Sequence, residues 1–99
     1  MKVGRISMES SEKGVFNRLM DDETSIEILR FCEFARPTSQ IIDHIYHLGR
    51  LGSQRNKVMM ELSKRLSELE GLKAIEFNNN SKCWATTKLG KKVLSKFFT

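Results

Sequence analysis

The sequence is poor in residues that break or crosslink a polypeptide chain. It has one proline, Pro37, and six glycines, so neither a proline-rich linker nor a disordered segment is expected. The two cysteines, Cys32 and Cys83, lie far apart and in no metal-ligand spacing. Because a secretion signal is lacking, we expect buried, reduced thiols, with a disulfide as the alternative in a hyperthermophile.

Long apolar runs are also missing. No apolar stretch approaches the roughly 20 residues that are needed to span a bilayer. The first residues, Met1 to Ser11, lack the apolar core of a signal peptide. The sequence therefore predicts a cytoplasmic (intracellular) protein with no membrane partner.

Motifs that carry chemistry are absent as well. There is no glycine-rich phosphate loop after a strand, no nucleophile elbow and no histidine-rich metal motif. His44 and His47 stand three apart, but no third ligand has a suitable spacing, so we expect a solvent-facing pair. We predict that the protein is not an enzyme and uses no metal, cofactor or small-molecule ligand.

The charge is positive and unevenly distributed. The formal net charge is +5, yet residues 21–36 carry five acidic and two basic side chains. Residues 71–99 carry six lysines and a single acidic residue, Glu76. The basic excess at this end indicates either a surface that meets a polyanion or a solvated lysine-rich face.

Ninety-nine residues are enough for one domain. We expect an N-terminal arm over residues 1–23, with a short helix capped by Ser11 and Glu12, and a folded domain over residues 24–99. The first main helix of that domain should run to about Arg36, because Pro37 disfavours a helical conformation in the residue before it.

Two further helices follow in the sequence. The second should be capped by Thr38 or Ser39 and broken by Gly49. The third should be capped by Ser53, continue to residue 70 and end at Gly71.

The pattern then changes to that of a hairpin. Residues 72–77 and 82–86 are strand-like, and the asparagines between them suit a turn, because asparagine tolerates positive φ. Thr86 or Thr87 should cap a last helix.

The stretch from Leu62 to Leu94 resembles the winged helix-turn-helix family. The residues that carry the resemblance are the helix end Leu66-Ser67-Glu68-Leu69-Glu70-Gly71-Leu72, and the second strand and last helix Trp84-Ala85-Thr86-Thr87-Lys88-Leu89-Gly90-Lys91-Lys92-Val93-Leu94. The pattern is most similar to small one-domain regulators of archaea and of their viruses and plasmids.

The resemblance implies an α+β fold with a three-helix core, a two-stranded wing hairpin and a C-terminal helix, here with an N-terminal extension. It also implies sequence-specific binding of double-stranded DNA and transcriptional regulation, which we expect from a homodimer. The alternative is a winged-helix protein-interaction module in a replication, transcription or membrane-remodelling complex. RNA binding is a third interpretation, which the shortage of exposed aromatics disfavours.

The third helix should present one face to the major groove. Its buried stripe holds Val58, Leu62, Leu66 and Leu69. Arginine and asparagine recognise base edges, whereas lysines suit phosphates. The predicted DNA-binding residues are the following: Ser53, Arg55, Asn56, Lys57, Met60, Lys64 and, on the wing, Lys82. The alternative is a solvated helix face with Lys57–Glu61 and Lys64–Glu68 pairs.

The first main helix is apolar almost all round. Ile28, Leu29, Cys32 and Ala35 share one face, so a single core leaves other apolar side chains uncovered. We expect a twofold homodimer to cover them, with the following interface residues: Phe16, Leu19, Ile26 and Phe34. The alternative is a monomer in which the N-terminal segment folds back.

Overall fold

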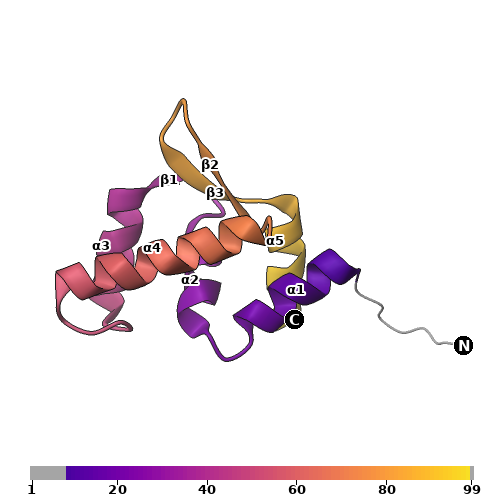
Figure 1. Ribbon diagram of the computed structural model, residues 1–99, viewed down its shortest axis with the longest axis horizontal. Coiled ribbons are helices and arrows are strands. Elements are labelled where there is room, and N and C mark those ends of the chain that lie inside the picture. The colour runs from indigo at the N-terminus through magenta and orange to yellow at the C-terminus, as the bar shows by residue number, and fades with distance from the viewer. Residues whose placement is uncertain (1–8, 99) are drawn as a thin grey trace, which may run out of the picture.

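The computed structural model describes residues 9–98, and Figure 1 shows a group of helices with a small sheet along one edge. The elements, in chain order, are α1 (Ser10–Leu19), α2 (Glu23–Phe31), β1 (Arg36–Pro37), α3 (Thr38–Leu48), α4 (Arg55–Gly71), β2 (Ile75–Asn78), β3 (Cys83–Thr86), α5 (Lys88–Leu94) and the 3-10 turn η1 (Ser95–Phe97). Within these residues no helix is both long and apolar enough to cross a membrane.

The antiparallel sheet has three strands in the order β1-β3-β2. Two strands were predicted, and the short strand β1 was missed. In β3, Trp84 lies opposite Arg36 on one side and Phe77 on the other. Its indole Nε1 donates a hydrogen bond to Thr38 Oγ1 at 2.9 Å, which ties the sheet to the first residue of α3. The hairpin of β2 and β3 projects beyond the helices (Figure 1).

The helix α1 is part of the core. Val15 and Leu19 are fully buried within their own chain, and Phe16 stacks on Phe97 with ring centroids 4.9 Å apart. Glu12 is also buried, and its Oε2 forms an ion pair with Lys92 Nζ of α5 at 2.6 Å. The N-terminal segment from Ser10 therefore folds back onto the C-terminal helix.

The predicted helix to Arg36 is five residues too long, since α2 ends at Phe31. The carbonyls that would continue the helix are used elsewhere: Leu29 O accepts from Thr86 Oγ1 at 2.7 Å, and Cys32 O accepts from Thr86 N at 2.9 Å. The end of β3 thus replaces the next turn of α2. Ala35, which was expected in the core, is exposed as a result.

Several predicted caps are shifted by one or two residues. Pro37 precedes α3, so Thr38 is its first helical residue, and Gln54, not Ser53, precedes α4. Gly71 is helical, and the left-handed conformation after α4 falls on Lys73. Gly49 does end α3 in that conformation, as predicted.

Gly90 allows α5 to lie directly against the start of the hairpin. A Cβ atom at this position would stand 2.2 Å from Ala74 O and 2.7 Å from Thr86 Cγ2. Thr87 caps α5 and donates its hydroxyl to Lys73 O at 2.6 Å. The base of the hairpin is therefore fixed on both sides.

Candidate nucleic-acid interface

The helix α4 has an apolar inner face and a polar outer face. Val58, Leu62 and Leu69 are fully buried against the core. On the opposite side Asn56 and Lys57 are exposed, and Met60 is 74% exposed. This arrangement agrees with the stripe expected from the sequence.

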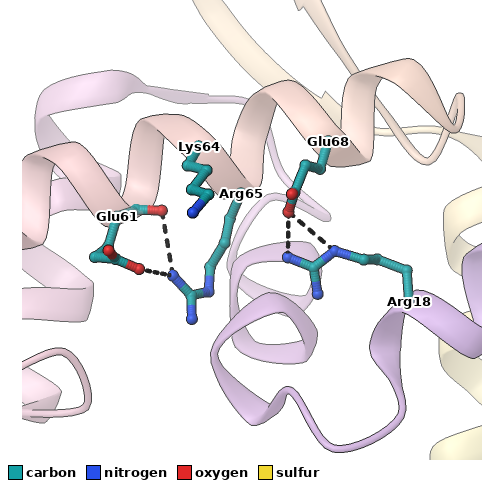
Figure 2. Close-up of a pocket in the computed structure, with 5 residues that line it drawn as sticks. All are labelled: Arg18, Glu61, Lys64, Arg65 and Glu68. Atoms are coloured by element: carbon teal, nitrogen blue, oxygen red, sulfur yellow. Dashed lines mark hydrogen bonds and ion pairs between the residues drawn. The ribbon is translucent and has the colours of Figure 1, made fainter.

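Two of the three acidic residues of α4, Glu61 and Glu68, are held by arginines at the flank of the helix. Glu61 Oε1 accepts from Arg65 Nη1 at 2.9 Å, and Glu68 Oε1 accepts from Arg18 of α1 at 2.5 and 3.0 Å, as Figure 2 shows. The Arg65 hydrogen bond lowers the pKa of Glu61. The alternative Lys57–Glu61 and Lys64–Glu68 pairs are not formed. Each of these two carboxylates therefore has an arginine partner.

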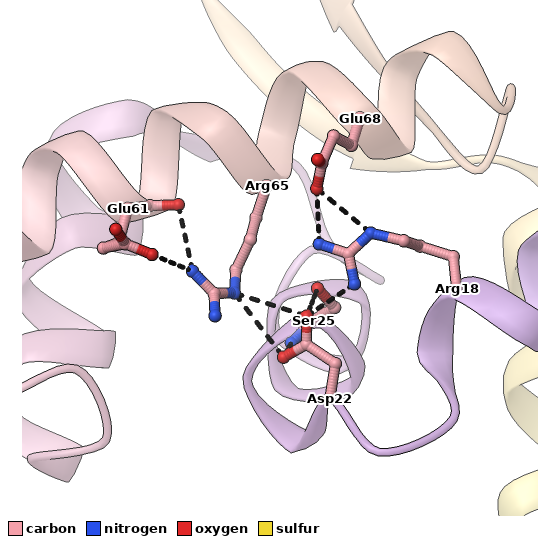
Figure 3. A network of polar contacts seen from close by, with 6 residues as sticks. All are labelled: Arg18, Asp22, Ser25, Glu61, Arg65 and Glu68. Carbon is pink, nitrogen blue, oxygen red and sulfur yellow. Dashed lines mark hydrogen bonds and ion pairs between the residues drawn. The ribbon is translucent and has the colours of Figure 1, made fainter.

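Asp22 joins this flank to α2 (Figure 3). It caps α2 by accepting from Ser25 N at 3.2 Å, and it also accepts from Ser25 Oγ at 2.8 Å and from Arg18 Nη1 at 2.5 Å. Arg65 Nε lies 3.4 Å from the same carboxylate. Burial would raise the pKa of Asp22, but the hydrogen bonds from Arg18 and Ser25 outweigh it and lower the pKa to about 2. One carboxylate thus connects three helices.

A shallow hollow of about 210 Å³ lies over this network, and Lys64 stands at its edge. Figure 2 shows Lys64 beside Glu61 and Arg65 without an ion pair to either. Within residues 9–98, neither Lys57 nor Lys64 forms an ion pair. Both ammonium groups are free for an external anion.

Arg55, predicted to recognise a base, is already engaged. Its Nη2 donates to Asp43 Oδ1 on α3, and its guanidinium lies 5.6 Å from the centre of the Tyr46 ring. Both partners of the ion pair are about half exposed, so the pair can open to solvent. Contact with DNA would require Arg55 to leave Asp43. Ser53 and Asn56 beside it are exposed.

Lys82 lies apart from the α4 residues, on the hairpin. Its backbone adopts φ 59°, the left-handed conformation that was expected for an asparagine. Asn78 instead holds the turn through its side chain, which accepts from Asn80 N at 2.8 Å and Ser81 N at 3.1 Å. The predicted DNA-binding residues therefore fall in two places, the exposed side and N-terminal end of α4 and the exposed turn of the hairpin.

The four predicted interface residues are not brought together. Leu19 lies in the core, Phe16 packs on Phe97, and Phe34 is 75% exposed in the turn after α2. Ile26 is half-buried beside Phe97 and Phe98, in a different hollow. The ion-pair network around Asp22 was not predicted from the sequence, although the spacing of Asp22 and Ser25 is typical of a helix N-cap.

The histidines and cysteines form no metal site in the described part of the chain. His44 Nε2 bonds Glu27 Oε2 at 2.7 Å and its ring stacks on Phe31, so His44 is not the solvent-facing group expected. Cys32 and Cys83 are free, and burial raises the pKa of the Cys32 thiol to about 12. Among residues 9–98 no three His, Cys, Asp or Glu side chains lie together as ligands would.

Comparison with known proteins finds no matching family model, no matching curated protein and no matching solved structure.

Proposed function

We propose that this chain is a winged helix-turn-helix protein that binds double-stranded DNA sequence-specifically and regulates transcription. The order of elements supports the proposal: α2, β1, α3, a short turn, α4, a hairpin and α5. In such a domain the second helix of the helix-turn-helix, here α4, lies in the major groove and the hairpin lies beside it.

The observation that carries the proposal is the distribution of charge around α4. Glu61 and Glu68 are each paired with an arginine that also contacts Asp22, whereas Lys57 and Lys64 have no ion pair within residues 9–98. A duplex that approaches the exposed side of α4 would meet these two unpaired ammonium groups, while Glu61 and Glu68 are held by their arginine partners. Neutralising phosphates with lysines releases counterions, which is the main source of sequence-independent affinity.

Roles follow from the chemistry of each side chain. Asn56 suits an adenine edge, and Met60 offers an apolar contact to a thymine methyl group. Lys57, Lys64 and Lys82 suit phosphates. Arg55 would recognise a guanine only after exchanging Asp43 for the base. In a homodimer, two copies of α4 would lie roughly 34 Å apart and read a palindromic site.

The test is a fluorescence anisotropy titration of a labelled duplex at several salt concentrations. The double variant Lys57→Ala/Lys64→Ala should bind about tenfold more weakly, and its log–log salt slope should be shallower by about 1.8, which is 0.9 for each lost phosphate contact. The matched control, Lys88→Ala/Lys91→Ala, removes two exposed lysines of α5 and should change neither quantity by as much.

Two outcomes would contradict the proposal. Micromolar protein that leaves the duplex unbound at about 50 mM salt would exclude a DNA-binding role of ordinary strength. Equal losses in the two double variants would indicate diffuse attraction without a defined interface on α4.

A second candidate function is that of a protein-interaction module. The exposed Phe34 and Phe98, at 75% and 55%, favour it, because large aromatic side chains are enriched at protein interfaces. This function becomes the preferred one if the duplex titration shows no binding.

A further inference from the structure

A second hollow, of about 250 Å³, lies on the outer side of α2. It is formed where α2 meets η1 and the turn after α3. Its lining residues are Glu23, Ile26, Glu27, Arg30, Arg50, Phe97 and Phe98. None of them belongs to the proposed DNA interface.

The hollow combines an apolar centre with a neutral rim. Phe98 is 55% exposed, and the Arg30 guanidinium lies 4.6 Å from the centre of its ring. Two acidic and two basic side chains border the apolar part. The whole chain carries a formal charge of +5, so two copies repel one another over most of their surface. The charged residues that line this hollow sum to zero, so this face does not add to the repulsion.

The order of charges along α2 is self-complementary. Glu23, Ile26, Glu27 and Arg30 occupy positions i, i+3, i+4 and i+7, which form one stripe of a helix. If two such stripes pack antiparallel about a twofold axis between positions 26 and 27, Glu23 faces Arg30 of the partner subunit. The same contact recurs on the other side of the axis, and Ile26, next to the axis, lies opposite Glu27 of the partner subunit.

Within one chain, Glu23 and Arg30 each have another partner, which contact with a second copy would share or replace. Glu23 Oε1 lies 3.2 Å from Arg50 Nη1, and Arg30 Nη1 lies 3.8 Å from Glu27 Oε1. Glu23 and Arg30 do not pair with each other within residues 9–98, since two helical turns separate them. A Glu23–Arg30 interaction is therefore a signature of contact between two copies.

We propose that the α2 face binds a second copy of the chain, with the two α2 helices antiparallel and Phe98 packed at the edge of the contact. This inference deepens the proposed DNA-binding homodimer by naming its surface. It replaces the interface predicted from the sequence, because Leu19 and Phe16 are used within the chain. Ile26 is retained, next to the axis.

Sedimentation equilibrium of the full chain without DNA tests the proposal, over about 1 to 100 μM. The wild type should reach twice the 11.4 kDa of one chain. Arg30→Glu and Glu23→Arg each place like charges opposite one another twice, and each should raise the dissociation constant about tenfold or more. The double variant Glu23→Arg/Arg30→Glu restores opposite charges across the axis and should associate more tightly than either single variant.

Two aromatic variants distinguish association through this face from nonspecific hydrophobic association. Phe98→Ala should weaken association, whereas Phe34→Ala, exposed but outside the hollow, should not. Circular dichroism of each variant checks that it is folded. A single-chain mass at the highest concentration, or a double variant weaker than both singles, would overturn the proposal. Because no DNA is present, neither result depends on whether the chain binds a duplex.

Discussion

The arginines and the lysines around α4 use positive charge differently. Arg65 and Arg18 are bound to Glu61, Glu68 and Asp22. Lys57 and Lys64, the second of them at the edge of the same hollow, have no carboxylate partner within residues 9–98. The first set holds three helices together, and the second is available to an anion from outside.

The same division extends over the described chain. Arginines make the ion pairs of the flank, of α2 and of the α3–α4 turn, whereas lysine takes part only once within residues 9–98, through Lys92. The planar guanidinium binds a carboxylate in a fixed geometry, and lysine is a compact charge on a flexible stem. Within residues 9–98, the positive charge that is left for an external anion is therefore carried mainly by lysines.

The largest effect is expected from removing the shared acceptor of the flank. Asp22→Ala deletes the cap of α2 and leaves Arg18 and Arg65 without this partner. We expect the free energy of unfolding to fall by about 2 kcal/mol, of which the cap contributes roughly 1 kcal/mol. Urea denaturation followed by circular dichroism measures the change.

The control for this experiment is Glu33→Ala, which removes an exposed acidic residue in the turn after α2. It should alter the free energy of unfolding by less than about 0.5 kcal/mol. A similar loss in both variants would mean that the flank depends on net charge rather than on the geometry around Asp22.

Lowering the pH should weaken the interactions around Asp22 over a defined pH range. The pKa of Asp22 is lowered from 3.8 to about 2, so its stabilising contribution is complete above pH 4 and is lost as the pH falls toward 2. Because the carboxylate is partly screened by solvent, this contribution is about 1 kcal/mol. The difference in unfolding free energy between the wild type and Asp22→Ala, measured from pH 5 to pH 2, should shrink by that amount. A constant difference would show that Asp22 is not stabilised as an anion.

The smallest effect concerns Arg55, the first residue of α4. Asp43→Asn weakens its ion pair and removes one negative charge from the proposed interface. We expect duplex affinity to rise about threefold and the salt slope to steepen by up to about 0.9 if Arg55 then meets a phosphate. The fold should be nearly unaffected, since exposed pairs contribute about 0–1 kcal/mol. Weaker binding by Asp43→Asn would show that Asp43 positions Arg55 for DNA instead of withholding it.

Much of the fold could be predicted from local patterns. The inward stripe of α4, the break at Gly49 and the strand-like segments of β2 and β3 each have a periodicity or turn residue that marks them. The short strand β1 has no such mark. Its two residues become a strand only because Trp84 and Cys83 lie beside them, and this contact is set by tertiary structure.

The candidate site was predictable in position but not in its electrostatics. Helical spacing placed Lys57 and Met60 on the exposed side of α4. It could not reveal that Glu68 binds Arg18, which is fifty residues away in the sequence, or that Asp43 holds Arg55. Ion pairs between distant segments depend on how helices pack, and the sequence pattern contains no direct record of that packing.

The packing of α1 on α5 also bears on how the protein folds during synthesis. Glu12 and Val15 are among the first residues of the described chain to emerge from the ribosome, whereas Lys92 and Val93 are among the last. Until α5 has emerged, α1 lacks the Lys92 ion pair and the Phe97 stack. Contacts of such long sequence separation form slowly, because the loop between them must close first. The contacts of α1 with Lys92 and Phe97 therefore form only after α5 and η1 have left the ribosome, and this part of the core closes last.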